Sequence, residues 1–153
     1  MSKLLKILYG TESGNAQYCA EILGEQLEKL AFDCIVEDMG FYESEQLDKE
    51  HLVIIVTSTH GNGDPPANAE GLLNYLRDNQ PDLSQLRYAV CALGDSSFTY
   101  FAQCGKDFDE ALRSCHAQSV IDRVDCDSDY DDDYEIFADR LISYLKSSSW
   151  KTQ

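Results

Sequence analysis

The chain has 153 residues, of which 43% are hydrophobic and 26% charged, the size and composition of one globular domain. Its formal net charge of -16 argues against nucleic-acid binding, because such affinity comes from Lys and Arg side chains that neutralise phosphates. No apolar run approaches the roughly 20 residues of a membrane span. The first residues enter a strand pattern without a signal-peptide cleavage site, so we expect a cytoplasmic monomer with no membrane partner.

Short apolar strands alternate with longer helical patterns along the chain. Strands are expected at residues 4–9, 32–38, 52–57, 88–93 and 119–124, and helices at 16–30, 67–77, 101–115 and 134–146, with a short helix or loop at 43–50. The run 52–57, Leu-Val-Ile-Ile-Val-Thr, is nearly all apolar, as in a central parallel strand covered on both faces. We therefore predict an α/β fold, a doubly wound three-layer α/β/α sandwich over residues 1–147 followed by a short C-terminal tail at 148–153.

The six cysteines contain no C-x-x-C pair, and none lies near a histidine at zinc-finger spacing. Several lie inside apolar runs, which is typical of buried free thiols in a reducing compartment. We expect neither a metal site nor a disulfide.

In doubly wound sheets the ligand binds beyond the carboxyl ends of the strands, where the strand order reverses. The first loop at that edge is 10–15, Gly-Thr-Glu-Ser-Gly-Asn, which lacks the Gly-Lys-Ser/Thr of a nucleoside-triphosphate P-loop and the G-x-G-x-x-G spacing. Its backbone N–H groups, the helix dipole and the side chains of Thr11, Ser13 and Asn15 suit a phosphate monoester. Simple N-capping by Thr11 or Ser13 explains the loop equally well.

The second loop, residues 57–66, joins a buried strand to a helix and is dense in hydroxyls, glycines and prolines. Ser58 and Thr59 are candidates to bind the same phosphate or a ribityl chain. Gly61 and Gly63 allow positive φ angles, so the 61–62 peptide can rotate beside a flat ligand. His60 is either a neighbour of the ring edge or a surface histidine without a role.

The third loop, residues 92–101, follows the fourth strand and places aromatic residues in a polar turn. Phe98 and Tyr100 either stack on a flat heterocycle or pack onto the loop itself. Backbone N–H groups near Gly94 and Asp95 suit the edge of a pyrimidine. Phe101 is expected in the core, as the first apolar position of the next helix.

Together the three loops resemble those of the flavodoxins, and more closely those of the FMN domains of diflavin reductases. The resemblance rests on the motifs at 11–15, 58–65 and 93–98 and extends from residue 6 to 145. The stretches 104–109 and 122–127 resemble in particular the flavodoxin-like domain of the sulfite reductase flavoprotein, and in extent the chain is similar to short-chain flavodoxins and stand-alone MioC-like proteins. The resemblance implies a flavodoxin-like fold with strand order 2-1-3-4-5 and FMN as the cofactor.

The resemblance also implies roles for residues in each loop. It implies phosphate binding by the first loop with Ser58 and Thr59, and ring contacts by His60 and Phe98. It places Gly61 and Asn62 near the flavin N5, and residues 93–95 near the pyrimidine side. The expected cofactor-binding set is Thr11, Glu12, Ser13, Gly14, Asn15, Ala16, Ser58, Thr59, His60, Gly61, Asn62, Gly63, Leu93, Gly94, Asp95, Phe98, Tyr100, Phe101 and Cys104. No catalytic residue is expected. Ala16 stands where the family often has a hydroxyl, so we expect weaker phosphate binding. His60 and Phe98 stand where the family frequently has Trp or Tyr, so the reduction potentials of family members do not transfer to this chain.

The expected function is low-potential electron transfer, from an NAD(P)H-dependent flavoprotein reductase with a basic face to an acceptor enzyme. The chain is expected to turn over no substrate of its own. Two alternatives stay open: an excised FMN domain of a diflavin reductase, and a flavin-dependent NAD(P)H oxidoreductase. A receiver-like signalling domain is disfavoured, because Tyr9-Gly10 and Val124-Asp125 stand where it needs an acidic pair and a Lys.

Acidic residues near the flavin are expected to lower its reduction potential, with Asp64, Asp95 and Asp127 as candidates. The run 122–135 holds eight acids and one base and begins at the carboxyl end of the predicted fifth strand. It is either the docking face for the basic partner or a solvated acidic loop.

Overall fold

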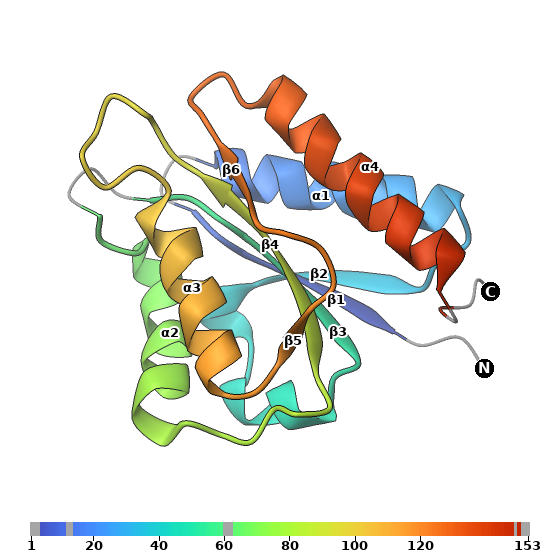
Figure 1. Cartoon of the computed structure of the whole chain (residues 1–153), viewed down its shortest axis with the longest axis horizontal. Helices are drawn as coiled ribbons and strands as arrows, with labels where there is room; N and C mark the ends of the chain where they lie inside the picture. Colours follow the sequence, from blue (N-terminus) through green and yellow to red (C-terminus); the bar gives the residue numbers. More distant parts are fainter. Residues whose placement is uncertain (1–3, 12–13, 60–62, 149, 151–153) are drawn as a thin grey trace.

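The computed structural model of the chain describes residues 4–11, 14–59, 63–148 and 150. A parallel sheet lies between two layers of helices (Figure 1), which confirms the predicted sandwich. Its strands are β1 (Leu5–Gly10), β2 (Cys34–Asp38), β3 (Leu52–Thr57), β4 (Arg87–Leu93), β5 (Gln118–Ser119) and β6 (Val124–Cys126). The helices are α1 (Asn15–Lys29), α2 (Ala67–Asn79), α3 (Gln103–Ser114) and α4 (Asp131–Ser147), with the 3-10 helices η1 (Met39–Phe41) and η2 (Ser44–Lys49).

The strand order β2-β1-β3-β4-β5 confirms the expected 2-1-3-4-5 order. β1 pairs with a strand on each side, and Ile7 is in register with Val36 of β2 and with Ile54 of β3. The order reverses between β1 and β3, so the loops that follow these two strands turn to opposite faces of the sheet. The crevice between them is where this class of fold binds ligands.

The fifth strand is interrupted, which corrects the continuous strand predicted at 119–124. β5 and β6 both pair with β4, and between them the Val120 N–H donates to Tyr88 O at 2.9 Å before the chain leaves the sheet. Arg123 stabilises the break, because its guanidinium bonds the carboxylates of Asp109 and Asp125, each at 2.7 Å. One of its two partners, Asp109, lies on α3, 14 positions away in sequence, and an apolar pattern does not reveal that contact.

Each face of the sheet has its own core. α1 and α4 pack against one set of strand residues, such as Ile7 and Ile54, and α2 and α3 pack against the alternate set, such as Leu8 and Ile55. Because successive residues of a strand point to opposite faces, β3 is buried along its whole length. The expectation of a central strand covered on both sides is confirmed.

Two helices begin two or more residues away from their predicted starts. α3 begins at Gln103 because Ala102 has a left-handed φ of 55°, so Phe101 lies in the turn before the helix, partly buried against the core of α2 and α3. α4 begins at Asp131, three residues before its predicted start. Its first turn holds the carboxylates of residues 131–133, which stabilise the positive end of the helix dipole.

All six cysteines are buried free thiols, as expected. Burial raises the pKa of Cys19 and of Cys104 to about 12. The segment expected as a tail contributes one buried side chain, Trp150, which is 6% exposed and belongs to the core of α1 and α4. No helix within the described ranges combines the length and apolarity needed to cross a bilayer.

Candidate functional site

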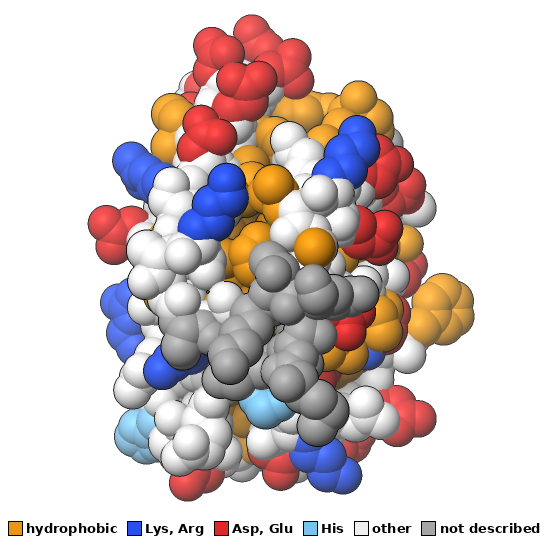
Figure 2. Space-filling model, turned by 90° about the vertical axis from the view of Figure 1, so that its right-hand side faces the viewer, with side chains coloured by type: hydrophobic (Ala, Val, Ile, Leu, Met, Phe, Trp, Pro, Cys, Tyr) orange, Lys and Arg blue, Asp and Glu red, His pale blue; other side chains and the backbone are white. Residues whose placement is uncertain are grey.

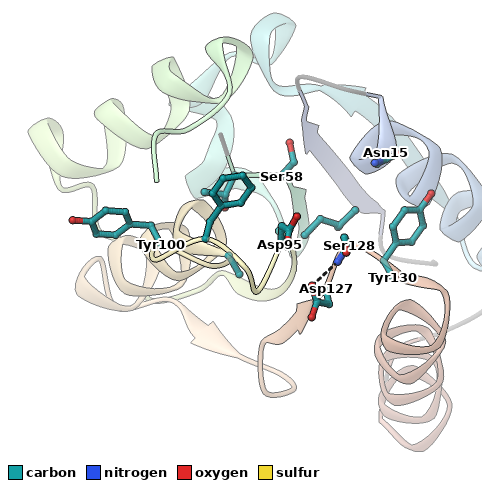
Figure 3. Close-up of a pocket in the computed structure, with 12 residues that line it drawn as sticks. Asn15, Ser58, Asp95, Tyr100, Asp127, Ser128 and Tyr130 are labelled. Atoms are coloured by element: carbon teal, nitrogen blue, oxygen red, sulfur yellow. Dashed lines mark hydrogen bonds between the residues drawn. The ribbon is translucent and has the colours of Figure 1, made fainter. Parts of the chain in front are cut away.

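A pocket of about 300 Å³ opens at the carboxyl edge of the sheet, beyond β1, β3 and β4 (Figure 3). This volume is at the lower end of the range for small-molecule sites, roughly 300–1,000 Å³. Four loops line it: Asn15 from the start of α1; Ser58 and Thr59 after β3; Leu93, Gly94, Asp95, Phe98, Tyr100 and Ala102 after β4; and Asp127, Ser128 and Tyr130 after β6. The three loops singled out in the sequence therefore meet, and a fourth joins them.

The β1–α1 loop is organised around Thr11. Its Oγ1 accepts a hydrogen bond from the Gly14 N–H at 2.8 Å, and its N–H donates to Asn68 Oδ1 at 3.0 Å. Gly14 occupies the N-cap position of α1 with a φ of 92°, so Thr11 bonds the cap residue itself and not the N–H groups of the first turn. Those N–H groups have no acceptor within the helix, and the Thr11 hydroxyl keeps its hydrogen. The loop end can therefore donate to an anion.

Ser58 gives the clearest local indication of a ligand. Its N–H donates to Gly10 O at 3.0 Å and extends the pairing of β1 with β3. Its Oγ is buried and has no hydrogen-bond partner among the residues that the structure describes. A buried hydroxyl without a partner costs about 1–3 kcal/mol. A polar ligand atom in the pocket would remove that cost.

Thr59 is engaged by the protein itself. Its Oγ1 accepts from the Cys104 N–H at 3.0 Å, at the start of α3, and Cys104 Sγ lies 3.3 Å from Thr57 Oγ1. These contacts tie the end of β3 to α3. Thr59 still lines the pocket, whereas Cys104 is fully buried behind it.

Asp127 connects the β4–α3 loop to the β6–α4 loop. Its carboxylate oxygens accept from the N–H and the hydroxyl of Ser96, at 2.9 and 2.5 Å, and from the Ser128 N–H at 2.7 Å. These bonds hold the pKa of Asp127 below its usual value, and the bond from the Ser96 hydroxyl has the largest effect. Asp95 Oδ1 accepts from the N–H and hydroxyl of Ser97 within the same loop. Both walls of the pocket are thus ordered by the protein's own bonds.

Gly94 is required by close packing at the start of the β4–α3 loop. A Cβ at this position would lie 2.7 Å from the Ala102 nitrogen. The Gly94 N–H donates to Cys126 O at 2.9 Å. Of the two N–H groups expected to bond a pyrimidine, this one is therefore already engaged within the protein.

The two loop aromatics lie differently. Phe98 and Tyr100 are 51% and 53% exposed, and both line the pocket. Tyr100 points away from Ser128 and Tyr130 in Figure 3. It packs against Gly63, where a Cβ would lie 2.8 Å from Tyr100 Cβ and where φ is 91°. Phe98 remains the candidate for stacking.

Several residues of the site were not in the expected set. Ala102, Ser128 and Tyr130 line the pocket, and Asn68 bonds the first loop. Tyr130 carried a signal in the sequence, an aromatic residue inside an acidic run after the last strand. Asn68 carried none, because its partners are distant along the chain.

Other expected residues lie outside the pocket lining. Ala16 is buried in the core under α1, and Phe101 lies in the turn before α3. The expected residues Glu12, Ser13, His60, Gly61 and Asn62 fall outside the described residues. Within the described part of the chain, no three His, Cys, Asp or Glu side chains form a group that could hold a metal ion.

The fold and the pocket together define a doubly wound α/β protein with a pocket at the carboxyl edge of its sheet, where this class of fold binds ligands. The donors at the start of α1, the unpartnered Ser58 hydroxyl and the exposed Phe98 ring fit the phosphate, the polar chain and the ring of a flavin nucleotide. The flavodoxin family model matches residues 7–138. The chain belongs to the flavodoxin family, and its cofactor is FMN.

Curated relatives are longer than this chain. It is 44% identical over 133 residues to the sulfite reductase (NADPH) flavoprotein alpha-component of Bacillus subtilis, an alignment that covers 86% of this chain and 22% of the relative. It is 38% identical over 146 residues to the protein of the same name from Baumannia cicadellinicola, covering 95% and 24%. The chain thus spans less than a quarter of the length of these relatives.

Solved structures of similar fold are flavodoxins. The flavodoxin of Streptococcus pneumonia TIGR4 superposes with a TM-score of 0.80 at 26% identity, covering 92% of this chain and 98% of that one. Oxidised flavodoxin 2 from Bacillus cereus gives a TM-score of 0.80 at 23% identity, covering 96% and 100%, which supports the fold alone.

Proposed function

We propose that this chain binds FMN in the pocket at the carboxyl edge and carries low-potential electrons from an NAD(P)H-dependent flavoprotein reductase to an acceptor enzyme. The buried hydroxyl of Ser58, a residue that lines the pocket, has no hydrogen-bond partner within the described residues and is the observation that carries the proposal. Membership of the flavodoxin family supports it.

Different loops of the chain are assigned to different parts of the cofactor. We assign the phosphate to the start of α1 and to the hydroxyls of Thr11 and Ser58, because donors gather there. We assign the ring to the β4–α3 loop, with Phe98 against it. The expected contacts of residues 12–13 and 60–62 remain predictions.

Bound FMN supplies the redox chemistry, and the protein sets the charge around it. Asp95 and Asp127 line the pocket, so negative charge added to the ring would be repelled and the reduction potential lowered. Asp64, the third candidate, is exposed and does not line the pocket.

Charge is distributed unevenly over the molecule, which supports docking of a basic partner at the flavin edge. The last turns of α1, α2, α3 and α4 carry Lys29, Arg77, Arg113 and Lys146, all at the amino edge of the sheet. Figure 2 shows Lys and Arg side chains interspersed with acidic ones over one face of the molecule, and a dense group of acidic side chains at its top. The acids that follow the pocket-lining Ser128, namely Asp129 and the first turn of α4, lie at the opposite edge. We propose this acidic segment as the docking face.

The cellular setting follows from similar reasoning. Six buried free thiols suit a reducing compartment, so we propose a cytoplasmic protein. We propose that it acts as a monomer whose partners are redox proteins.

Reduction by a partner tests this function. The FMN-loaded chain is mixed with NADPH and a flavoprotein reductase that has a basic interface, and flavin absorbance is followed as salt is raised. We expect the rate to fall about tenfold or more as ionic strength screens the attraction. The variant with Asp129, Asp131 and Asp132 changed to Asn should react more slowly at low salt and depend less on salt.

A flat salt response of the unaltered chain would remove the docking face. Steady NADPH oxidation by the chain alone, without a reductase, would contradict the carrier role and favour an NAD(P)H oxidoreductase.

A second candidate function rests on the relatives. The 44% identity to one segment of a much longer sulfite reductase flavoprotein favours an FMN domain that works within or beside a diflavin reductase. In that case a reductase module of this relative type should reduce the chain faster than an unrelated flavodoxin reductase does. Equal rates with both would argue against this candidate.

A further inference from the structure

We propose that Asn68 is a positioning residue for the FMN phosphate: from the first turn of α2 its side chain holds Thr11, just after β1, where the phosphate is proposed to bind. The inference rests on the proposed placement of the phosphate at this loop. Neither Asn68 nor Thr11 is among the residues that line the pocket, and Asn68 acts by holding the Thr11 N–H beside the start of α1.

Asn68 joins three segments of the carboxyl edge. Its Oδ1 accepts from the Thr11 N–H at 3.0 Å, and its Nδ2 donates to Asp38 Oδ1, also at 3.0 Å. Asp38 Oδ1 in turn accepts from the Gly40 N–H at 2.7 Å, just after β2. The end of β2, the start of α2 and the loop after β1 are therefore linked through one amide.

The chemistry of the partners fixes the orientation of this amide. The carboxylate of Asp38 accepts hydrogen bonds, so it must face the NH₂ group of Asn68. A backbone N–H donates, so Thr11 must face the amide oxygen. Asn is suited to this position because it supplies a donor and an acceptor on one short side chain.

Close packing brings α2 to the loop. A Cβ on Gly10 would lie 2.8 Å from Ala69 Cβ and 3.1 Å from Met39 Sδ, and Ala69 is fully buried. A glycine at the end of β1 thus lets the first turn of α2 approach, and Asn68, one residue before Ala69, then reaches Thr11.

The bond to Asn68 determines what Thr11 offers to a ligand. With its N–H held by Asn68 and its Oγ1 accepting from Gly14, the Thr11 side chain is fixed at the start of α1, and among the described residues no acceptor takes its hydroxyl hydrogen. Without Asn68 the Thr11 N–H loses its acceptor and the loop loses its link to α2 and β2. Contacts to the phosphate should weaken, whereas contacts to the ring, made by other loops, should not.

The test compares FMN with riboflavin, which has the same ring and no phosphate. Affinities of the apoprotein for both are measured by quenching of flavin fluorescence. For Asn68→Ala we expect the Kd for FMN to rise about tenfold, which corresponds to the loss of one to two hydrogen bonds. The Kd for riboflavin should stay within about twofold. Asn74→Ala, at an exposed position of the same helix, is the matched control and should change neither affinity.

A second variant decides the case if Asn68→Ala does not fold, as judged by circular dichroism. Asp38→Ala removes the anchor of Asn68 and should weaken FMN binding several-fold with riboflavin unchanged. Loss of a nearby negative charge alone would instead strengthen phosphate binding, so the sign separates the two effects.

The failures are distinguishable. If the unaltered chain binds FMN no more tightly than riboflavin, the proposed phosphate site is wrong. If it prefers FMN and Asn68→Ala keeps the full preference, or loses both affinities equally, the positioning role of Asn68 is overturned. FMN binding that is unchanged or tighter in Asp38→Ala overturns it as well.

Discussion

Asp127 is a single carboxylate that serves two loops of the pocket. It accepts two hydrogen bonds from Ser96 of the β4–α3 loop and one from Ser128 of its own loop. Because the bonds favour the charged form, the pKa of Asp127 is lowered in the folded protein. The link between the loops is therefore complete above the pKa of the unfolded chain, about 3.9, and is lost as pH falls through the lower folded value.

This carboxylate predicts an acid-sensitive ring site. Riboflavin is the better probe, because it has no phosphate that titrates. Asp127→Asn should bind riboflavin a few-fold more weakly at pH 7, since it loses a charge-assisted hydrogen bond. The unaltered chain should approach that lower affinity as pH falls through the lowered pKa of Asp127, which lies under the ordinary value of about 3.9, as measured by fluorescence quenching.

Asp129→Asn is the control, an exposed carboxylate two residues along the same loop. It should leave both the affinity and its pH dependence unchanged. If Asp127→Asn matches the unaltered chain at pH 7, the carboxylate does not order the ring loop.

Two helices of the same layer differ in how closely they approach their neighbours. A Cβ on Gly105 of α3 would lie 3.0 Å from the Cα of Ala92 in β4 and closer still to its Cβ, so only glycine fits between helix and strand. Gly71 of α2 is exposed and has nothing within 4 Å of such a Cβ. Substitutions at Gly105 and Gly71 therefore distinguish the effect of tight packing from that of helix propensity.

Substitution at these two glycines should change stability in opposite directions. Gly105→Ala should lower the free energy of unfolding by about 1–3 kcal/mol, because α3 must move away from β4. Gly71→Ala should raise it by about 0.5–1 kcal/mol, because alanine restricts the unfolded chain and favours the helix. Urea unfolding followed by circular dichroism measures both. A loss at Gly71 or no loss at Gly105 would contradict the packing described for these helices.

Local patterns were sufficient to predict the strands and helices of the interior. The apolar run of β3 predicted a strand buried on both faces, and the stripe of α1 predicted its packing on the sheet. The break between β5 and β6 could not be predicted, because it depends on an ion pair of Arg123 with Asp109 of α3. The start of α3 was missed for a similar reason, since Ala102 adopts a left-handed conformation that nothing in its residue type indicates.

The candidate site was predictable only where motifs are contiguous. Loops 10–15, 57–66 and 92–101 were found because each follows a strand and is rich in hydroxyls, glycine or aromatics. Their supports, Asn68 and Asp127, could not be identified in those roles, because each acts through residues 30 or more positions away in sequence. Residue type within a loop predicts what it can bind, whereas the bonds that fix the loop depend on the fold.

At the scale of the whole molecule, the topology and the distribution of charge favour the same edge. Parallel strands bring the loops after β1, β3, β4 and β6 to one side, and the helices that return between strands end with a basic residue on the other side. The edge that holds the pocket is left acidic, so a basic partner is drawn to the cofactor. The strand order thus positions the site and also orients the charge of the protein.

FMN uptake tests the central claim most directly. Apoprotein prepared by denaturation and refolding is titrated with FMN while flavin fluorescence and absorbance are recorded. We expect a yellow protein that binds one FMN per chain and quenches its fluorescence. The Kd should lie below about 1 μM, which corresponds to a binding free energy near -8 kcal/mol. A folded apoprotein that takes up no FMN at micromolar concentration would contradict it.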